Sequence, residues 1–232
     1  MRRLSNDKTW PKVCIPIVET EMSEGMKAIE EANPLADLIE LRMDYLKKID
    51  LISLTRCARK PLIVTNRRKE EGGKYLGGEK KRIEILEQAI DLGVAYIDIE
   101  VRTERPLLKR LLKNRNRTQV ILSFHDHQRT PSAKELQRLY DQMYGLGADI
   151  LKVVTFAKSW EDNLIPLSLI PFAKREGYEI VTFCMGEKGR MSRIFAPMLG
   201  GAWTYASLRN HRTSAPGQLN VLEIRRIWEN LG

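Results

Sequence analysis

The sequence predicts an α/β protein of the (β/α)8 barrel type, the TIM barrel. Eight short apolar runs alternate along the chain with stretches of helical periodicity. Such alternation is typical of parallel strands covered by helices. The length of 232 residues is close to the ~250 that is usual for this fold. We therefore expect one catalytic domain over residues 1–232.

The eight strand candidates are short runs, most of them rich in valine, isoleucine and threonine, which favour strands. Polar or glycine-containing segments separate them from the helical stretches. Eight such units in a chain of this length favour a closed barrel over an open sheet. The candidates are residues 13–18, 37–41, 62–65, 96–100, 119–124, 150–154, 179–184 and 203–206.

Four of the intervening stretches carry apolar residues at clear helical spacing, which predicts helices packed on a sheet by one face. The third stretch has Thr130 as its candidate N-cap and Pro131 at the first helical position. The four stretches are residues 79–92, 105–112, 130–143 and 218–231. The last of them is expected to turn Ile224, Ile227, Trp228 and Leu231 inward.

A doubly wound open sheet is the alternative fold. It would favour a glycine-rich phosphate loop directly after its first strand. Residues 19–24 follow the first strand candidate and contain no glycine. The barrel is therefore the preferred prediction.

The formal net charge is +9, from 39 basic and 30 acidic side chains, which raises nucleic acid as a partner. Both signs are interleaved along the chain, and the densest basic stretch, residues 109–117, is typical of a helix end. The tyrosines and tryptophans are not interleaved with basic residues as in an RNA-binding face. We expect a solvated surface and no nucleic-acid partner, with a non-catalytic RNA-binding protein as the alternative.

Cysteine usage and the N-terminal segment indicate a cytoplasmic protein. Cys14, Cys57 and Cys184 are far apart and form no metal or disulfide spacing, which suits a reducing compartment. Residues 1–12 are polar and basic and lack the apolar centre of a signal peptide. No run approaches the ~18 apolar residues of a membrane span, so no membrane partner is expected.

Lys152 is the most unusual residue of the predicted strands, because it interrupts an apolar run, Ile-Leu-Lys-Val-Val. An ammonium in the helix layer or in the barrel interior is costly unless it is paired or deprotonated. A deprotonated lysine attacks ketones to form a Schiff base. A lysine that pairs with a carboxylate for structural reasons is the alternative.

His125 follows the apolar strand that precedes the strand of Lys152. Imidazole can take and return a proton near neutral pH. Successive strands are neighbours in a barrel, so both side chains can reach one substrate, although a structural role for His125 is the alternative. His127 and His211 have no comparable position and are expected at the surface.

Three arginines, Arg42, Arg67 and Arg193, follow the second, third and seventh strand candidates and are expected to converge at the carboxyl end of the barrel, where such enzymes build their sites. The planar guanidinium suits a carboxylate or vicinal hydroxyls, which indicates a small, oxygen-rich, anionic substrate. Glu40 is expected to bind hydroxyls or to pair with an arginine. Ordinary ion pairs at the barrel rim are the alternative.

Motifs for metal and nucleotide cofactors are absent from the sequence. It contains no HExxH, no cysteine–histidine metal spacing, no GxSxG and no Walker loop. The glycine pairs at 72–73 and 77–78 do not open helices as phosphate loops do. We expect no cofactor and no metal.

Seven motifs follow one another in order at the predicted strand ends. They are Glu40-Leu41-Arg42-Met43-Asp44, Thr65-Asn66-Arg67 with Glu71-Gly72-Gly73, Asp98-Ile99-Glu100, Phe124-His125-Asp126, Asp149-Ile150-Leu151-Lys152, Met185-Gly186 with Gly189 and Ser192-Arg193, and Ser214-Ala215-Pro216-Gly217-Gln218. Together they resemble type I 3-dehydroquinate dehydratase, the third enzyme of the shikimate pathway. The resemblance extends from Val13 to Trp228.

The resemblance implies a lyase that dehydrates 3-dehydroquinate to 3-dehydroshikimate through a lysine Schiff base, without cofactors and commonly as a homodimer. Lys152 matches the Schiff-base lysine, His125 the histidine that moves the C2 proton, and Arg193 the arginine that binds the carboxylate. Glu71 and Asp98 match acids near that histidine. The remaining predicted site residues are expected to hold the substrate: Glu40, Arg42, Arg67, Met185, Tyr205, Ser214, Ala215 and Gln218.

The sequence departs from the family pattern at two bulky residues. Phe183 and Tyr205 stand where the resemblance leads us to expect a methionine and a phenylalanine, and both keep bulk beside the substrate, so only fine packing is expected to differ.

The polar loop 207–217 is expected to act as a lid, with Gln218 at its far hinge. The chain ends after the eighth helix, so we expect an enzyme that is not fused to shikimate dehydrogenase.

A different Schiff-base barrel, such as a class I aldolase, is the alternative activity. It would share Lys152 and would usually act on a phosphorylated substrate. A glycine-rich phosphate loop after the seventh or eighth strand would then be expected, and none is evident in the sequence.

Overall fold

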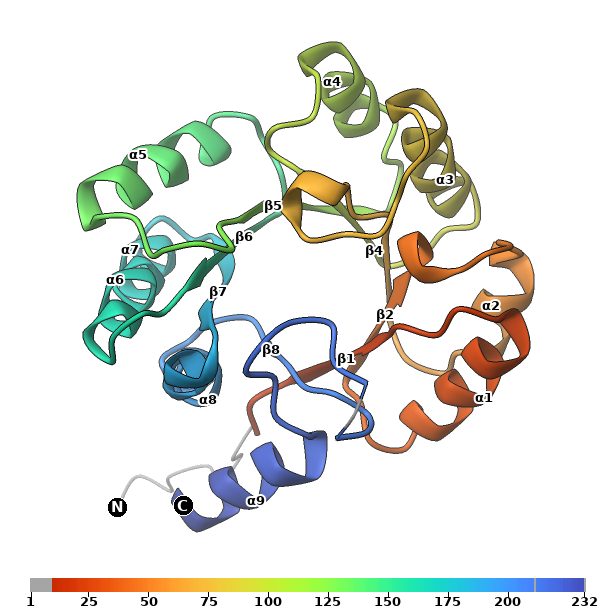
Figure 1. Cartoon of the computed structure of the whole chain (residues 1–232). Helices are drawn as coiled ribbons and strands as arrows, with labels where there is room; N and C mark the ends of the chain where they lie inside the picture. Colours follow the sequence, from red (N-terminus) through yellow and green to blue (C-terminus); the bar gives the residue numbers. More distant parts are fainter. Residues whose placement is uncertain (1–9, 211, 232) are drawn as a thin grey trace, which may run out of the picture.

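The structure, a computed structural model, describes residues 10–210 and 212–231. Eight strands surround one axis and helices surround the strands (Figure 1). The strands are β1 (Val13–Ile17), β2 (Leu38–Arg42), β3 (Leu62–Thr65), β4 (Tyr96–Glu100), β5 (Gln119–His125), β6 (Ile150–Phe156), β7 (Glu179–Met185) and β8 (Thr204–Tyr205).

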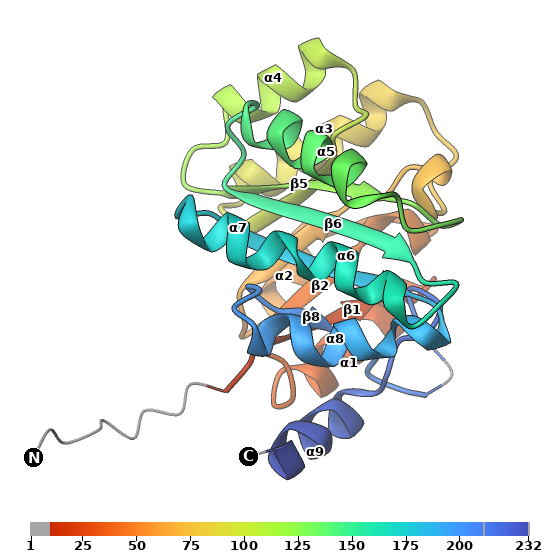
Figure 2. The same ribbon diagram turned by 90° about the vertical axis from the view of Figure 1, so that its left-hand side faces the viewer.

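The helices form an outer layer over the strands (Figure 2). The α-helices are α1 (Met22–Ala32), α2 (Leu51–Cys57), α3 (Glu79–Asp91), α4 (Arg105–Lys113), α5 (Ala133–Tyr144), α6 (Leu164–Leu167), α7 (Leu169–Arg175), α8 (Arg190–Met198) and α9 (Val221–Leu231). Four single 3-10 turns follow strand ends: η1 (Met43–Tyr45), η2 (Lys69–Glu71), η3 (Glu161–Asn163) and η4 (Glu187–Gly189).

The strand order confirms the predicted barrel and excludes the doubly wound sheet. All pairs are parallel, and each strand pairs with its neighbour in the sequence from β1 to β7. β8 pairs with β1, and β7 contacts β8 at the last junction (Figure 1). A doubly wound sheet would instead reverse its strand order at a switch point.

The inward side chains lie in layers, because residues two apart on a strand share a face. At the amino ends of the strands the interior is apolar, with Leu38, Ile121 and Ile150 in one buried cluster. Two residues farther along β5 and β6, the inward positions hold Ser123 and Lys152, which are register partners. The polar layer therefore rests on an apolar floor.

Three details of the predicted helices are wrong. α5 begins with Ser132 as N-cap, not Thr130, because Ser132 and Glu135 form a reciprocal capping box, while the Thr130 hydroxyl donates to the carbonyl of Phe156. α9 begins at Val221, later than the predicted residue 218. Leu231, expected to face inward, is 50% exposed because it lies beyond Trp228, the last buried residue of that helix.

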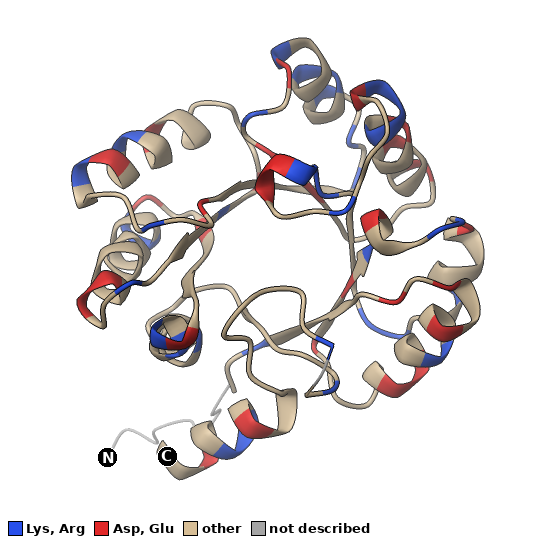
Figure 3. Cartoon of the chain, viewed as in Figure 1, with Lys and Arg blue, Asp and Glu red and all other residues tan. Residues whose placement is uncertain are grey.

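Charged side chains of both signs are interleaved around the outer helices (Figure 3). This distribution agrees with the mixed-charge surface expected from the sequence. Within residues 10–210 and 212–231, no helix is long and apolar enough to cross a membrane.

Candidate active site

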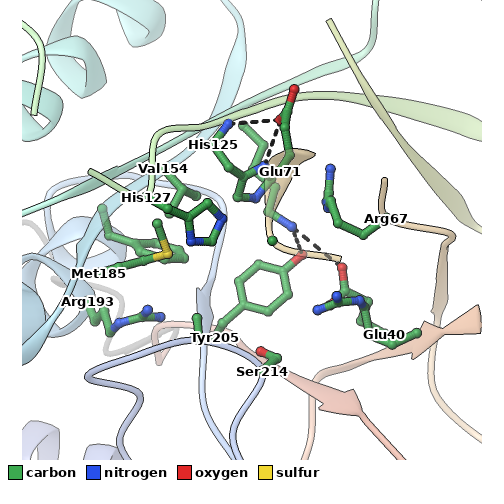
Figure 4. A pocket seen from close by; sticks show the side chains of 15 residues that line it. Glu40, Arg67, Glu71, His125, His127, Val154, Met185, Arg193, Tyr205 and Ser214 are labelled. Carbon is green, nitrogen blue, oxygen red and sulfur yellow. Dashed lines mark hydrogen bonds and ion pairs between the residues drawn. The ribbon is translucent and has the colours of Figure 1, made fainter. Parts of the chain in front are cut away.

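A pocket of about 460 Å³ lies at the carboxyl end of the barrel (Figure 4). Side chains from several strands and from the loop after β8 point into it. Its lining consists of Glu40, Arg42, Arg67, Glu71, Gly72, His125, His127, Lys152, Val154, Phe183, Met185, Arg193, Tyr205, Ser214 and Ala215.

Lys152 enters the barrel interior from β6 and is 4% exposed. Its Nζ lies 2.8 Å from Asp98 Oδ2 and 3.5 Å from Glu40 Oε1. Nζ also donates a hydrogen bond to the Tyr205 hydroxyl at 3.1 Å. Of the two orientations that the sequence left open for Lys152, the structure has the inward one, and three oxygen groups surround the nitrogen.

Asp98 lies beneath Lys152 and takes part in a buried network. It pairs with Arg67 Nη2 at 2.8 Å and accepts a hydrogen bond from Ser123. Burial opposes ionisation, but Arg67 and Lys152 hold the pKa of Asp98 well below its ordinary value. Asp98 was expected near His125, and its closest partner in the structure is the lysine, whose Nζ donates a hydrogen bond to Asp98 Oδ2.

His125 and Glu71 form the second functional pair. Glu71 Oε2 accepts a hydrogen bond from the His125 backbone N–H at 3.1 Å and lies 3.4 Å from Nδ1. Burial, supported by the charges of Arg67 and Lys152, lowers the pKa of His125 well below 6.5, so the imidazole is neutral near pH 7. Burial raises the pKa of Glu71 to about 7, against the opposing charge of Arg67. The pair therefore has a neutral base and a carboxyl that titrates near neutrality.

The three predicted arginines do converge on the pocket, but only two of them have carboxylate partners among the described residues. Arg42 forms two hydrogen bonds with Asp44, at 2.8 and 2.9 Å. Arg67 pairs with Asp98 and with Glu100, at 2.8 and 3.1 Å. Both are therefore neutralised before any substrate binds.

Arg193 differs from the other two arginines. It is fully buried on α8, and burial lowers its pKa to about 10. Its guanidinium carbon lies 4.3 Å from the centre of the Phe183 ring, and Nη2 makes a long contact of 3.4 Å with the Pro216 carbonyl. Nε has no hydrogen-bond partner among the described residues. A buried cation in this state attracts an anion into the pocket.

A chain of buried charges links the pocket to the helix layer. Arg67 and Arg82 both pair with Glu100, at 3.1 and 2.6 Å. Arg82 lies on α3, is 1% exposed and also pairs with Glu79 at 2.8 Å. α3 therefore fixes Glu100, which in turn fixes Arg67.

The loop after β8 covers one side of the pocket. Ser214 and Ala215 line the pocket, and Gln218 lies behind them, where its Oε1 accepts a hydrogen bond from the Ser214 N–H at 2.8 Å. Arg212 pairs with the buried Glu19. The loop is thus attached to the segment that follows β1.

Eleven of the thirteen predicted site residues line the pocket, and the exceptions are Asp98 and Gln218, which support it from behind. The prediction for His127 is incomplete. It is exposed as expected, yet it lines the pocket and stacks on His125 with ring centres 6.3 Å apart. Its position only two residues after His125 was the available signal. His211 lies outside the described residues.

Gly72, the middle residue of the Glu71-Gly72-Gly73 motif, also lines the pocket and was not among the predicted site residues. It adopts φ of 79°, which favours glycine. A Cβ atom there would collide with the imidazole ring of His127. The turn after η2 therefore needs glycine in order to bring Glu71 against His125.

Comparison with known proteins agrees with this geometry. The sequence model of type I 3-dehydroquinase matches residues 13–232. The chain is 34% identical over 220 residues to the 3-dehydroquinate dehydratase of Methanocaldococcus jannaschii, covering 93% of this chain and 97% of the relative. It is 35% identical over 221 residues to that of Methanococcus maripaludis, covering 94% and 98%.

The solved structure of 3-dehydroquinate dehydratase from Geobacillus kaustophilus superposes with a TM-score of 0.88 at 27% identity, covering 96% of this chain and 91% of that one. Fold, pocket and sequence thus agree, and the resemblance noted from the motifs is confirmed. The chain belongs to the type I 3-dehydroquinase family.

Proposed function

We propose that this chain dehydrates 3-dehydroquinate to 3-dehydroshikimate, with Lys152 as the residue that forms the Schiff base. The family and the names of its relatives support this reaction. The observation that carries the assignment is the position of Lys152. Of the described residues that line the pocket it is the one lysine, and it is buried in the pocket that His125 and Arg193 also line.

Arg193 binds the substrate carboxylate in this proposal, because it is the buried cation of the pocket without a carboxylate partner among the described residues. Glu40, Arg42 and Arg67 face the same space and suit the ring hydroxyls. Met185 and the ring of Tyr205 supply apolar surface. The substrate is thus held by its charge at one end and by its hydroxyls at the other.

The reaction begins when His125 takes a proton from the ammonium of Lys152 and the resulting amine attacks the C3 ketone. His125 returns that proton as the C3 oxygen leaves as water, which gives a protonated imine. The imine withdraws electrons from C2 more strongly than the ketone does. His125, a neutral base, removes a C2 proton and forms an enamine. The enamine expels the C1 hydroxyl, which receives the proton from His125, and hydrolysis of the imine releases the product.

Glu71 orients His125 through the contact with Nδ1 and stabilises the imidazolium while His125 holds the proton. Asp98 balances the charge of Lys152 and of the protonated imine that replaces it. Neither carboxyl needs to touch the substrate for these effects. The two acids thus act through the histidine and the lysine respectively.

Several further assignments belong to the same proposal. We propose that residues 1–232 work as one catalytic domain, that two copies form a homodimer, and that the enzyme is cytoplasmic. The resemblance to the family supports the homodimer, and the cysteine pattern supports the compartment.

Borohydride reduction tests the central assignment. Borohydride added with 3-dehydroquinate should attach one ligand to the protein, and peptide mass spectrometry should place it at Lys152. Lys152→Met should give no adduct and no enone product, because methionine has no amine. Lys134→Met, at an exposed position of α5, is the matched control and should retain both. An adduct at another lysine, or none in the wild type, would contradict the proposal.

A further inference from the structure

The hydroxyl of Tyr205 lies against the nitrogen of Lys152, the residue that forms the Schiff base in the proposed function. It accepts a hydrogen bond from Lys152 Nζ at 3.1 Å, and the centre of the ring lies 4.3 Å from the same nitrogen. Tyr205 is 4% exposed, and its ring packs at a tilt on Phe183 with centres 6.0 Å apart. A phenylalanine would supply this ring without the hydroxyl. The departure from the family pattern therefore adds a polar group beside Lys152 and changes more than fine packing.

The phenol keeps its proton in this position. Burial, together with the charge of Glu40, raises the pKa of Tyr205 well above its ordinary value of 10. A neutral phenol can accept one hydrogen bond and donate another at the same time. A group with both abilities, in contact with an atom that gains and loses protons, can pass a proton without becoming charged.

We propose that Tyr205 is a catalytic residue that relays a proton from the Lys152 nitrogen to the C3 oxygen of the substrate while the imine forms. The inference rests on the proposed Schiff-base role of Lys152. When the amine attacks, a C3–N bond forms and the π pair of the carbonyl moves onto oxygen. The nitrogen is then positively charged and the oxygen negatively charged. The nitrogen gives a proton to Tyr205 Oη while Oη gives its own proton to the oxygen.

The relay removes a geometric obstacle. Direct transfer from nitrogen to oxygen across C3 passes through a four-membered ring with a strongly bent hydrogen bond, and bent hydrogen bonds are weak. Inclusion of the phenol gives a six-membered ring with straighter hydrogen bonds. The phenol is neutral before and after the transfer, which fits its burial.

Protons and electrons balance over the whole sequence. His125 takes one proton when the ammonium of Lys152 becomes an amine. It returns that proton to the C3 hydroxyl, which leaves as water, and the nitrogen lone pair closes the C=N bond. Hydrolysis of the product imine uses the same groups in reverse. Tyr205 therefore serves both the formation and the breakdown of the imine.

Tyr205→Phe tests the relay, because it removes the hydroxyl and keeps the ring. Rapid-quench trapping with borohydride measures how fast the adduct forms. We expect the rate to fall by ~10²-fold, within the usual range of proton-transfer catalysis. Quinate, which has a hydroxyl in place of the ketone, measures binding without imine formation, and its Kd should change less than about twofold. Tyr178→Phe is the matched control, since its hydroxyl donates to the Ala148 carbonyl outside the pocket, and it should keep the wild-type rate.

Trapping at the wild-type rate in Tyr205→Phe would overturn the inference. So would a slower rate with an equal loss of quinate binding, because that pair of results indicates a packing defect. Tyr205→Met, a second variant without the hydroxyl, replaces Tyr205→Phe if the latter fails to fold. Failure of the proposed function gives a different result, which is the absence of any adduct in the wild type.

Discussion

Replacement of Arg193 should make the free protein more stable and the complex with product weaker. Arg193 is fully buried, and its partners among the described residues are a ring and a distant carbonyl. A charge in such a place destabilises the fold until an anion arrives. We expect Arg193→Met, which keeps an unbranched side chain of lower polarity, to separate these two effects.

The size of the stability change follows from the pKa of Arg193. The lowering of this pKa from 12.5 to about 10 corresponds to ~3 kcal/mol against the charged form in the free protein. Loss of the contact with Phe183 lowers the stability of the variant by ~1 kcal/mol, and loss of the long hydrogen bond to Pro216 lowers it by about 1 kcal/mol more. The free energy of unfolding should therefore rise by ~1 kcal/mol, which corresponds to an increase in Tm of ~2–4 °C for a domain of this size.

The binding effect has the opposite sign. Loss of a buried charged partner costs ~2 kcal/mol or more, so the Kd for 3-dehydroshikimate should rise ~30-fold or more. An analogue with a neutral amide in place of the carboxylate should bind wild type and variant about equally. Thermal unfolding with and without product measures both quantities.

Arg42→Met is the contrasting variant, because it removes the guanidinium that pairs with the buried Asp44, and it should lower stability by ~3 kcal/mol. The backbone N–H groups of Arg67 and Lys74 would still donate to that carboxylate. A loss of stability in Arg193→Met, or an unchanged Kd for the product, would refute the argument for an unpaired cation. Equal losses for the carboxylate and the amide would refute its assignment to the carboxylate.

Two further predictions concern pH and the loop. The carboxyl of Glu71 has a pKa of about 7 in the folded protein, against an ordinary value of 4.5. Between these two pH values the folded state binds more protons than the unfolded state. The stability that this group contributes is therefore present below pH 4.5 and is lost as the pH rises through 7. Glu71→Gln should therefore lose less stability than the wild type as the pH rises across this window. The pH profile of kcat/KM should also lose its acid limb near pH 7 in this variant. An acid limb that persists in Glu71→Gln would show that another group causes it. The loop 207–217 should open in the free enzyme, because the exposed pair Arg209–Glu31 contributes only ~0–1 kcal/mol. Trypsin should cleave at Arg209 or Arg212 faster in the free protein than with saturating product, and faster still in Glu19→Gln, which lacks the partner of Arg212; equal cleavage with and without product would show that the loop is not a lid.

The sequence was sufficient to predict the barrel because its strands are short runs that stand out from their surroundings. All eight were placed within two residues at each end, and β3 and β4 coincide with the predicted ranges. The sequence does not reveal where the short helices begin and end. α2 has seven residues, and α7 carries a proline near its start, so neither shows a long periodic face.

The identity of the site residues was predictable because strand ends meet at one edge, whereas their pairing was not. Lys152 contacts Asp98 and Tyr205, which are 54 and 53 residues away along the chain. Such contacts depend on the stagger of strands around the barrel, which spacing along one strand does not reveal. For the same reason the sequence did not reveal that Arg193 lacks a carboxylate partner among the described residues, or that His127 stacks on His125.

The buried charges that run from Arg67 through Glu100 to Arg82 have a consequence for protein engineering. Barrel enzymes are often treated as a neutral scaffold on which loops can be exchanged. Here the scaffold helix α3 supplies Arg82, and without it Glu100 would lie in the interior with Arg67 as its one cationic partner among the described residues. A transplant of the catalytic residues into a foreign barrel would need to carry this helix as well. The active site therefore depends on more residues than those that surround the substrate.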